Sequence, residues 1–295
     1  MPSSSSSWPW LPSDAARRQH PRSTGVPVTA LGRSSVRHTV ALPGHGGAVE
    51  LSWHGVTHTG YRRTANEDSY LADVPLFAVA DGMGGHSHGD RASDAVVRRL
   101  QACVEGDFVG IESVQHALHL ATWDIHHLDD EDRGIGTTVT GAGLDVLDGG
   151  AVFRVFNVGD SRVYRFQGNE LTQVTRDHSV VQELVDAGQI LAADAEAHPE
   201  SNVITRAVGF SLEPEADLTI VPLVPGLRLL LCSDGLTKEL PAERIRLHLA
   251  ARLSARETAN ALLDAALAQG GRDNITIIVI DVVHAPTSSP SESLD

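Results

Sequence analysis

The sequence contains only two cysteines among 295 residues. Cys232 lies in an apolar strand-like run and Cys103 on the apolar side of a predicted helix, so we expect both to be small core residues. Two cysteines of this kind provide no disulfide framework. The sequence also lacks an apolar run long enough to span a membrane, and its N-terminus lacks the basic-then-apolar order of a secretory signal. We therefore expect a cytoplasmic protein with no membrane span.

Basic residues are scarce as well: 23 lysines and arginines stand against 38 aspartates and glutamates, a formal net charge of -15. A nucleic-acid-binding protein normally presents a basic face, so this balance argues against nucleic acid as a partner. The acidity is instead typical of a protein that binds cations. A chain of 295 residues is long enough for one large or two small domains with a sizeable core.

The two ends of the chain differ in composition from the middle. Residues 1–48 are rich in Ser, Pro, Arg and Gly and show no periodic apolar positions. Such a segment buries too little surface to offset its ordering entropy, which predicts a disordered N-terminal tail. The folded domain is expected to cover residues 49–284, and residues 285–295 to form a Ser/Pro-rich C-terminal tail. An insertion at about residues 176–202 is expected to lie as a flap beside the Asp160 strand.

Periodic apolar positions predict three helices, at residues 88–104, 111–128 and 255–268, and helix start and stop signals predict a short fourth helix at residues 180–187. Strand-like runs precede, separate and follow them. The first of these runs, residues 50–57, is expected to be an edge strand. This order of elements favours a layered α+β domain over a strictly alternating parallel fold.

Aspartates stand repeatedly at the ends of strand-like runs. The run that begins at Leu76 ends in Asp81 and a glycine cluster, which carries a carboxylate out of a buried strand. One such Asp-Gly pair is more often a simple turn. The pattern recurs, however, at three further aspartates: Asp160, Asp234 and Asp273.

If these strands belong to packed sheets, one edge can collect the four carboxylates into a single acidic cleft. Like charges gathered in this way repel, so a cation is needed to hold them together. Glycines beside the first carboxylate allow the backbone to approach a ligand closely. An oxygen-only ligand set, with no Cys or His at zinc-ligand spacing, favours Mg²⁺ or Mn²⁺ over zinc.

A short loop adds charges of both signs. Arg63 precedes the acidic pair Glu67 and Asp68 by four residues, so the loop offers an anion donor and two candidate metal ligands. A charged surface turn is the alternative reading of this loop.

Taken in order, these motifs resemble the metal-dependent protein phosphatases of type 2C, especially the bacterial ones. The resemblance covers about residues 49–283 and depends on six motifs in the family's order: Arg63-x-x-Asn66-Glu67-Asp68, Asp81-Gly82-Met83-Gly84-Gly85, Gly136-Thr137-Thr138, Val158-Gly159-Asp160-Ser161-Arg162, Cys232-Ser233-Asp234-Gly235 and Asp273-Asn274. Each motif alone is weak, but six in order make coincidence very improbable.

The resemblance implies an α+β four-layer sandwich, in which two antiparallel β-sheets are flanked by helix pairs and the metal cleft lies at one edge. It implies two Mn²⁺ or Mg²⁺ ions, bridged by Asp81. The Gly82 carbonyl, Asp234 and Asp273 would complete the first site, and Glu67 would hold the second ion, mostly through water.

Three further roles follow from the resemblance. Asp160 with Asp234 would supply a third-metal site, and Arg63 would bind the phosphate, so that Arg63, Asp81 and Asp234 form the catalytic set. The implied reaction is hydrolysis of phosphoserine or phosphothreonine in proteins by attack of a metal-bridging hydroxide. No covalent nucleophile is required, so we interpret Ser161 and Ser233 as turn residues.

One position departs from the eukaryotic relatives, which often carry a histidine proposed as general acid directly after the Asp-Gly pair. Met83 stands there in this chain. His86 and His88 lie close by in sequence, but we favour structural or solvent-facing roles for both, with water as the acid.

Several alternatives remain open. The chain could be a catalytically silent relative that binds phosphoproteins, a phosphatase of anti-sigma-factor antagonists, or an unrelated magnesium hydrolase of small phosphate esters. Our leading interpretation is a monomeric serine/threonine phosphatase. Its expected partners are phosphorylated proteins, namely substrates of bacterial serine/threonine kinases and the kinases themselves.

Overall fold

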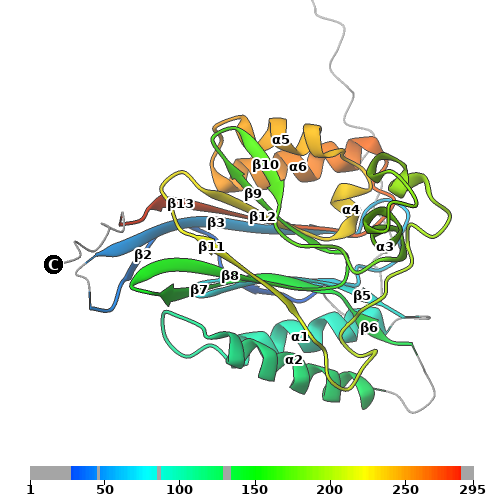
Figure 1. The fold of residues 1–295 in the computed structure, drawn as a ribbon, viewed down its shortest axis with the longest axis horizontal. Coiled ribbons are helices and arrows are strands. Elements are labelled where there is room, and N and C mark those ends of the chain that lie inside the picture. The colour runs from blue at the N-terminus through cyan, green and yellow to red at the C-terminus, as the bar shows by residue number, and fades with distance from the viewer. Residues whose placement is uncertain (1–27, 45–46, 85–87, 129–133, 287–295) are drawn as a thin grey trace, which may run out of the picture.

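The computed structural model describes residues 28–44, 47–84, 88–128 and 134–286. Two β-sheets lie face to face, and helices cover the outer face of each (Figure 1). Helices α1 and α2 lie against one sheet, and α5 and α6 lie against the other. The predicted α+β four-layer sandwich is confirmed.

The first sheet contains seven strands. Its order is β1 (Ala30–Gly32), β4 (Asp68–Asp73), β5 (Leu76–Met83), β7 (Val139–Leu147), β8 (Gly150–Val158) and β11 (Asp217–Pro222), and β6 (Gly136–Thr137) pairs with β5. All of its pairs are antiparallel except β1 with β4, which run parallel.

The second sheet contains six strands, and all of its pairs are antiparallel. Its order is β10 (Glu170–Gln173), β9 (Arg162–Gln167), β12 (Arg228–Cys232), β13 (Ile275–His284), β3 (Ala48–His58) and β2 (Ser35–Ala41). The helical elements in the described residues are α1 (Gly89–Ala102), α2 (Ile111–His126), α3 (Val180–Asp186), the 3₁₀ helix η2 (Ala192–Ala197), α4 (Asp234–Thr237), α5 (Ala242–Ala250) and α6 (Ala255–Gln269).

The inner faces of the two sheets form the central core. Trp53 of β3 packs edge-on against Phe77 of β5, with ring centroids 5.4 Å apart, and Phe77 packs in the same way against Phe153 of β8 at 6.4 Å. Edge-to-face contacts of this kind are the arrangement that aromatic pairs favour. Because these rings come from both sheets, they hold the two layers together and position their edges.

Each long helix buries a stripe of apolar side chains against a sheet. Val96 and Leu100 of α1 and Val114 and Leu118 of α2 are fully or almost fully buried under the first sheet. The four predicted helices correspond to α1, α2, α3 and α6, with ends that differ by at most two residues. The short α5 was not predicted. None of the helices in the described ranges is both long and apolar enough to cross a membrane.

The predicted N-terminal boundary at residue 48 is wrong in part. Residues 30–32 form β1 and residues 35–41 form β2, so the folded part starts before residue 48. β2 pairs with β3, and the predicted edge strand is therefore an inner strand of its sheet. β1 pairs with the distant β4 and β2 pairs with the next strand, β3, and a composition test detects neither pairing. Residues 1–27 and 287–295 lie outside the described residues.

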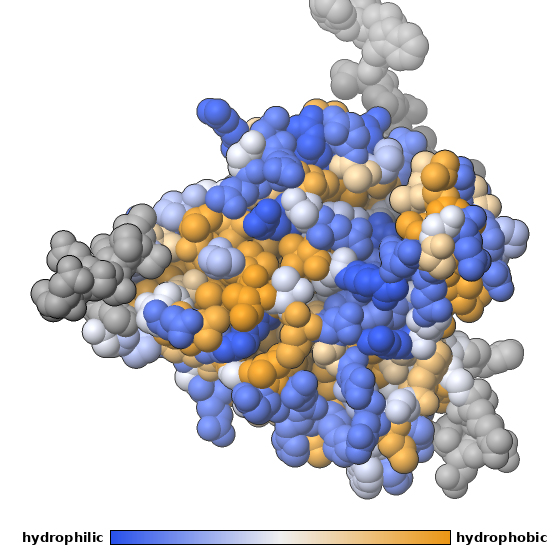
Figure 2. Space-filling model, in the orientation of Figure 1, coloured by the Kyte–Doolittle hydropathy of each residue, from blue (hydrophilic) through white to orange (hydrophobic). Residues whose placement is uncertain are grey.

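The surface beside the sheets is divided into two areas. Figure 2 shows apolar surface around β8 and β11 and hydrophilic surface between this area and the segment that carries α3. The edge strand β11 contributes to the apolar area with the half-exposed side chains of Leu218 and Ile220.

Candidate active site and metal centre

A cleft of about 950 Å³ lies at the edge of the two sheets, and it is lined by residues from segments far apart in the sequence. All four strand-end aspartates line it, together with Arg63, Glu67 and Gly82. The predicted flap also contributes: its lining residues are Asp177, Ser179, Val181, Ala195, Glu196, Ala197, Ser201 and Asn202. The structure thus brings together every predicted site residue except Asp68.

Asp81 lies within β5 rather than beyond its end, because the strand continues to Met83. Its backbone N–H donates to the Thr138 hydroxyl at 3.2 Å, and its carbonyl accepts from the Thr138 N–H at 2.9 Å. The next residue must be glycine, because a Cβ on Gly82 would lie 2.0 Å from the carbonyl oxygen of Gly89 at the start of α1. At the residues Asp81 and Gly82, β5 is therefore contacted by Thr138 and by the start of α1.

Asp234 is the first residue of α4, directly after β12. Gly235 packs so closely on β13 that a Cβ there would lie 1.8 Å from the carbonyl oxygen of Asn274. One carboxylate oxygen of Asp234, Oδ2, pairs with the Lys238 ammonium. The other, Oδ1, is buried and accepts no hydrogen bond from the described residues. Such an orphaned oxygen is costly unless a ligand pairs with it.

Asn274 fixes the acidic loop beside Asp273. Its Oδ1 accepts from the Glu67 N–H at 2.8 Å, and its Nδ2 donates to the carbonyls of Thr59 and Ala65 at 2.9 Å each. The side chain therefore uses both of its ends to hold the 59–67 loop against the start of β13. This contact places Glu67 on the same side of the cleft as Asp273.

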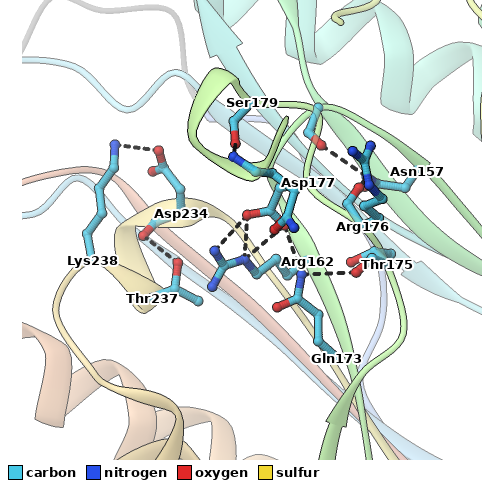
Figure 3. A network of polar contacts seen from close by, with 12 residues as sticks. Asn157, Arg162, Gln173, Thr175, Arg176, Asp177, Ser179, Asp234, Thr237 and Lys238 are labelled. Atoms are coloured by element: carbon cyan, nitrogen blue, oxygen red, sulfur yellow. Dashed lines mark hydrogen bonds and ion pairs between the residues drawn. The ribbon is translucent and has the colours of Figure 1, made fainter. Parts of the chain in front are cut away.

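Asp160 follows β8 and faces the flap. Burial, with added repulsion from the Asp234 and Asp177 charges, raises the pKa of Asp160 to about 7, although the Lys238 ammonium acts in the opposite direction. Nearby, Arg162 donates to both carboxylate oxygens of Asp177, at 2.6 and 3.0 Å (Figure 3). This bidentate pair anchors the first residues of the flap to β9.

Asp68 lies behind the cleft, and it is not among the lining residues. Its buried carboxylate accepts from the hydroxyls of Ser233 at 2.8 Å and Thr276 at 2.7 Å. Burial raises its pKa to about 7, against the lowering effect of these two hydrogen bonds. Asp68 opposes Asp81 in the β4–β5 ladder. Its Oδ2 therefore supports the strands that carry Asp81 and Asp234, while its Oδ1 is buried and accepts no hydrogen bond from the described residues.

Arg63 forms a two-point ion pair with Asp273, with Nε 2.7 Å from Oδ1 and Nη2 2.9 Å from Oδ2. Its hydrogen bond to Asp273 raises the pKa of the guanidinium, which stays charged. The side chain is 52% exposed at the rim of the cleft. It therefore presents a planar donor to an anion that enters there.

The carboxylates of the cleft repel one another. Burial raises the pKa of Asp81 well above its ordinary value, and the charges of Asp68, Asp234 and Asp160 raise it further. Burial also raises the pKa of Glu67. In the described residues no three of these groups come together around one point as a ligand set, and Arg63 and Lys238 pair with Asp273 and Asp234 respectively. The oxygen-only donor set and the orphaned Asp234 Oδ1 fit a hard divalent cation that would relieve this repulsion.

The remaining predicted positions have structural roles. Ser161 and Ser233 are fully buried, and their hydroxyls are engaged with Thr138 and Asp68 respectively. His88 is the N-cap residue of α1, and Met83 lines the cleft. His86 lies outside the described residues.

Several cleft residues were not predicted from the sequence. They are Arg162, Asp177, Lys238, Glu239 and Arg272. The spacing of Lys238, four residues after Asp234, was a usable signal, because residues four apart share one side of a helical turn. The Arg162–Asp177 pair joins positions 15 apart across a turn, and no local pattern indicates it.

Comparison with known proteins agrees with this geometry. The family model described as "Protein phosphatase 2C" matches residues 57–269. The two-sheet sandwich and its acidic, oxygen-lined cleft define a class of α+β proteins built to bind cations. Within that class, the chain belongs to the protein phosphatase 2C family. The predicted family is confirmed.

Named relatives are similar over most of the chain. The "Serine/threonine protein phosphatase PstP" of Mycobacterium tuberculosis is 38% identical over 230 residues, which is 76% of this chain and 43% of the relative. The chain thus spans less than half the length of that protein. The "Protein phosphatase PhpP" of Streptococcus pneumoniae is 36% identical over 239 residues, which is 77% of this chain and 96% of the relative.

Solved structures show the same fold. A crystal structure of the M. tuberculosis PstP/Ppp phosphatase has a TM-score of 0.72 and 35% identity, and the match covers 80% of this chain and 100% of that one. The catalytic domain of PstP in complex with two manganese ions has a TM-score of 0.70 at 35% identity, and the match covers 80% of this chain and 99% of that one.

Proposed function

We propose that this chain hydrolyses phosphoserine and phosphothreonine in proteins with the help of Mn²⁺ or Mg²⁺. The observation that carries the proposal is the cleft itself, where carboxylates from four distant segments meet beside an exposed arginine. The names of the relatives, which are serine/threonine phosphatases, support the same activity.

The metal-binding residues in this proposal are Asp81, Asp234, Asp273, Glu67 and the carbonyl of Gly82. Bound divalent ions supply a water of lowered pKa and neutralise charge on the phosphoryl oxygens. The two manganese ions in the structure of the PstP catalytic domain support a divalent metal as the cofactor. Asp81 and Asp234 are the central ligands, because both carboxylates line the cleft, Asp81 is raised in pKa by burial and by the charges of its neighbours, and Asp234 has an orphaned Oδ1.

Arg63 binds the substrate phosphate. Its guanidinium lies at the rim, and its partner Asp273 is one of the proposed ligands. When Asp273 turns toward a cation, Arg63 is released to pair with an anion of matching two-oxygen geometry. Asp68 acts as a positioning residue, since its buried carboxylate ties β4 to the Ser233 hydroxyl.

The substrates are phosphorylated proteins rather than small esters, because the cleft continues along the flap and offers polar groups beyond the acidic centre. We place the chain in bacterial signalling, as a cytoplasmic monomer that opposes serine/threonine kinases and acts on the kinases too. The bacterial sources of the relatives support this setting.

The test is hydrolysis of p-nitrophenyl phosphate and of a phosphothreonine peptide with Mn²⁺, with Mg²⁺ and with chelator. Turnover is expected with either metal and is abolished by chelator. Asp81→Asn and Asp234→Asn are each expected to lower kcat by at least about a thousandfold, because each removes part of a metal site that contributes several kcal/mol.

The matched control is Asp264→Asn, which removes the same charge from α6 at a position that does not line the cleft. This variant is expected to keep wild-type turnover. Phosphopeptide binding without turnover under any metal would contradict the proposal and favour a silent phosphoprotein-binding relative. Faster turnover of nucleotides or sugar phosphates than of phosphopeptides would contradict the protein substrate.

A further inference from the structure

The flap joins β10 of the second sheet to β11 of the first through two limbs, an entry limb at residues 177–180 and an exit limb at residues 203–206. The limbs lie side by side, since Ser179 and Ile204 form an antiparallel bridge. His178 belongs to the entry limb, and its side chain is only 1% exposed. A buried polar ring therefore lies at the base of the flap.

The His178 backbone is bonded both to the first sheet and to the exit limb. Its N–H donates to the Gly159 carbonyl at 2.9 Å, and its carbonyl accepts from the Thr205 N–H at 2.8 Å. Gly159 immediately precedes Asp160 in the turn after β8. His178 thus connects both limbs of the flap to the turn that carries a cleft carboxylate.

The imidazole adds a second contact with the same turn. Its Nδ1 accepts from the Gly159 N–H at 3.1 Å. A ring nitrogen that accepts carries no proton, which assigns the proton of the neutral imidazole to Nε2. Nε2 makes no hydrogen bond within the described residues, but it lies 3.1 Å from Oδ2 of Asp217 at the start of β11. The firm contact of the ring is therefore the one that Nδ1 makes with Gly159.

No solvent is available to replace this contact, because Gly159 is buried. The Gly159 carbonyl also accepts from Nδ2 of the buried Asn157 at 3.0 Å, and the same Nδ2 donates to the Arg176 carbonyl at 3.1 Å (Figure 3). Without the His178 ring, the carbonyl would keep its donors and the N–H would lose its acceptor. A buried N–H left in this way is costly, so the turn and the entry limb would separate to admit water.

The exit limb leads to the other side of the cleft. Just beyond it, Val208 and Thr137 exchange backbone hydrogen bonds of 2.9 and 3.0 Å. The Thr137 hydroxyl donates to the Asp81 carbonyl at 2.9 Å. The flap is thus tied to the backbone near Asp160 by one limb and near Asp81 by the other, and His178 contacts both limbs.

We propose that His178 is a positioning residue that holds the flap over the cleft and thereby controls the binding of phosphorylated peptides. The proposal rests on the phosphatase function proposed above. His178 does not line the cleft, whereas Ala195, Ser201 and Asn202 of the flap do. A phosphopeptide extends from the acidic centre along these residues, but p-nitrophenyl phosphate is too short to do so.

The first test compares two substitutions by steady-state kinetics with Mn²⁺ on both substrates. His178→Leu removes both ring nitrogens and keeps an apolar side chain in the buried site. It is expected to raise KM for a phosphothreonine peptide at least about tenfold, because the buried Gly159 N–H loses its acceptor. The kcat for that peptide and kcat/KM for p-nitrophenyl phosphate are expected to stay within about twofold of wild type, because the cleft carboxylates are kept.

His178→Asn is the conservative variant, because its side chain can place an acceptor oxygen where Nδ1 lies. Its KM for the phosphopeptide is expected to stay within about threefold of wild type, since the Gly159 N–H remains paired. Equal KM values for the Asn and Leu variants would overturn the role of Nδ1. Equal losses on the peptide and on p-nitrophenyl phosphate would overturn the role in peptide binding.

The matched control is His119→Leu, the same substitution at an exposed position of α2. It is expected to leave the kinetics on both substrates unchanged. Circular dichroism of each variant establishes that it is folded before its kinetics are compared.

A second measurement follows the flap without using activity. Hydrogen exchange of the backbone amides of residues 177–206 is expected to be at least about tenfold faster in His178→Leu than in wild type, because local opening of the flap becomes easier. Exchange in α1 and α2 is expected to stay unchanged. Equal exchange of the flap amides in wild type and His178→Leu would overturn the proposal. If the wild type hydrolysed neither substrate with any metal, the proposed function would fail, and the exchange rates would still decide whether His178 holds the flap.

Discussion

The two ends of β12 hold buried charged groups in opposite ways. At its start, the buried Arg228 makes five hydrogen bonds, two of them to Asp281 at 2.5 and 2.9 Å and the others to Leu249, Thr258 and Leu253. Just past its end, Asp234 keeps a buried oxygen that accepts no hydrogen bond from the described residues. A fully paired charge stabilises the fold, whereas an incompletely paired one is held ready for a ligand.

The same difference appears in the charge balance. Arg228 and Asp281 are opposite charges from neighbouring strands. Around Asp234, burial and repulsion among carboxylates raise the pKa values of Asp81 and Asp160. One end of β12 is therefore fully paired within the protein, whereas at the other end Lys238 pairs with one oxygen of Asp234 and a divalent cation is expected to add further stability. Three predictions test this comparison.

The largest effect on stability is expected at the paired end. Arg228→Met leaves the Asp281 carboxylate and two backbone carbonyls without their donor, and breaking a buried pair in this way lowers the free energy of unfolding by about 3–5 kcal/mol. Urea denaturation in the presence of chelator measures this loss in the free energy of unfolding. Specific activity of the folded variant is expected to stay at the wild-type level.

The control for this change is Arg33→Met, which removes an arginine that pairs with Asp73 on the surface. It is expected to leave the urea midpoint unchanged, because exposed pairs contribute little. Equal urea midpoints for the two variants would show that the Arg228 hydrogen bonds contribute no more to stability than an exposed ion pair does.

Metal binding is expected to stabilise the other end. At Mn²⁺ concentrations about a hundred times the dissociation constant, binding to the folded state alone contributes about 2.7 kcal/mol. For a domain of this size that raises Tm by about 5–10 °C, as measured by differential scanning fluorimetry.

Asp234→Asn is expected to lose most of this rise in Tm, since it weakens the central ligand. Arg228→Met is expected to keep it, because its change lies at the far end of the strand. A rise of equal size in wild type and Asp234→Asn would place the metal away from the cleft.

The smallest effect is a pH dependence in chelator. The pKa of Asp160 is raised from 3.8 to about 7 in the folded state, so the folded protein holds this proton more tightly than the unfolded chain. Stability from this group is present at low pH and is lost as the pH rises toward about 7.

The comparison is between wild type and Asp160→Asn by urea denaturation at about pH 5 and about pH 7.5. The wild type is expected to lose on the order of 1 kcal/mol more than the variant between these two values. If the free energies of unfolding of wild type and Asp160→Asn changed with pH in parallel, burial and neighbouring charges would not raise the pKa of Asp160. Saturating Mg²⁺ is expected to reduce the difference, because cations stabilise the ionised carboxylates.

Much of the fold could be predicted because the residue pattern of a helix or strand is contained in its own segment of the sequence. Apolar positions at helical spacing predicted α1, α2 and α6. In contrast, β1 and β2 have no such pattern: β2 carries exposed Arg37 and Thr39, and both strands are stable because they pair with β4 and β3. The composition of residues 1–48 therefore led to the wrong prediction that these two strands belong to a disordered tail.

The candidate site shows the same limit. Aspartates next to apolar runs and glycines predicted Asp81, Asp160, Asp234 and Asp273, and all four line the cleft. The adjacent residues Glu67 and Asp68 were treated alike, yet successive residues at the start of β4 turn to different sides. Glu67 lines the cleft, whereas Asp68 is buried and bonded to Ser233, 165 positions away in the sequence.

The sequence by itself thus determined the layers, the strand-end carboxylates and the class of ligand, because residue type and spacing act over a few neighbouring positions. Only the tertiary structure decided which charges meet: Arg63 with Asp273, Asp68 with Ser233 and Thr276, and Lys238 with Asp234 and Asp273. Most of these pairings join segments far apart in the chain. They depend on how the two sheets pack at one edge. Burial at that edge shifts the pKa values of the charged side chains.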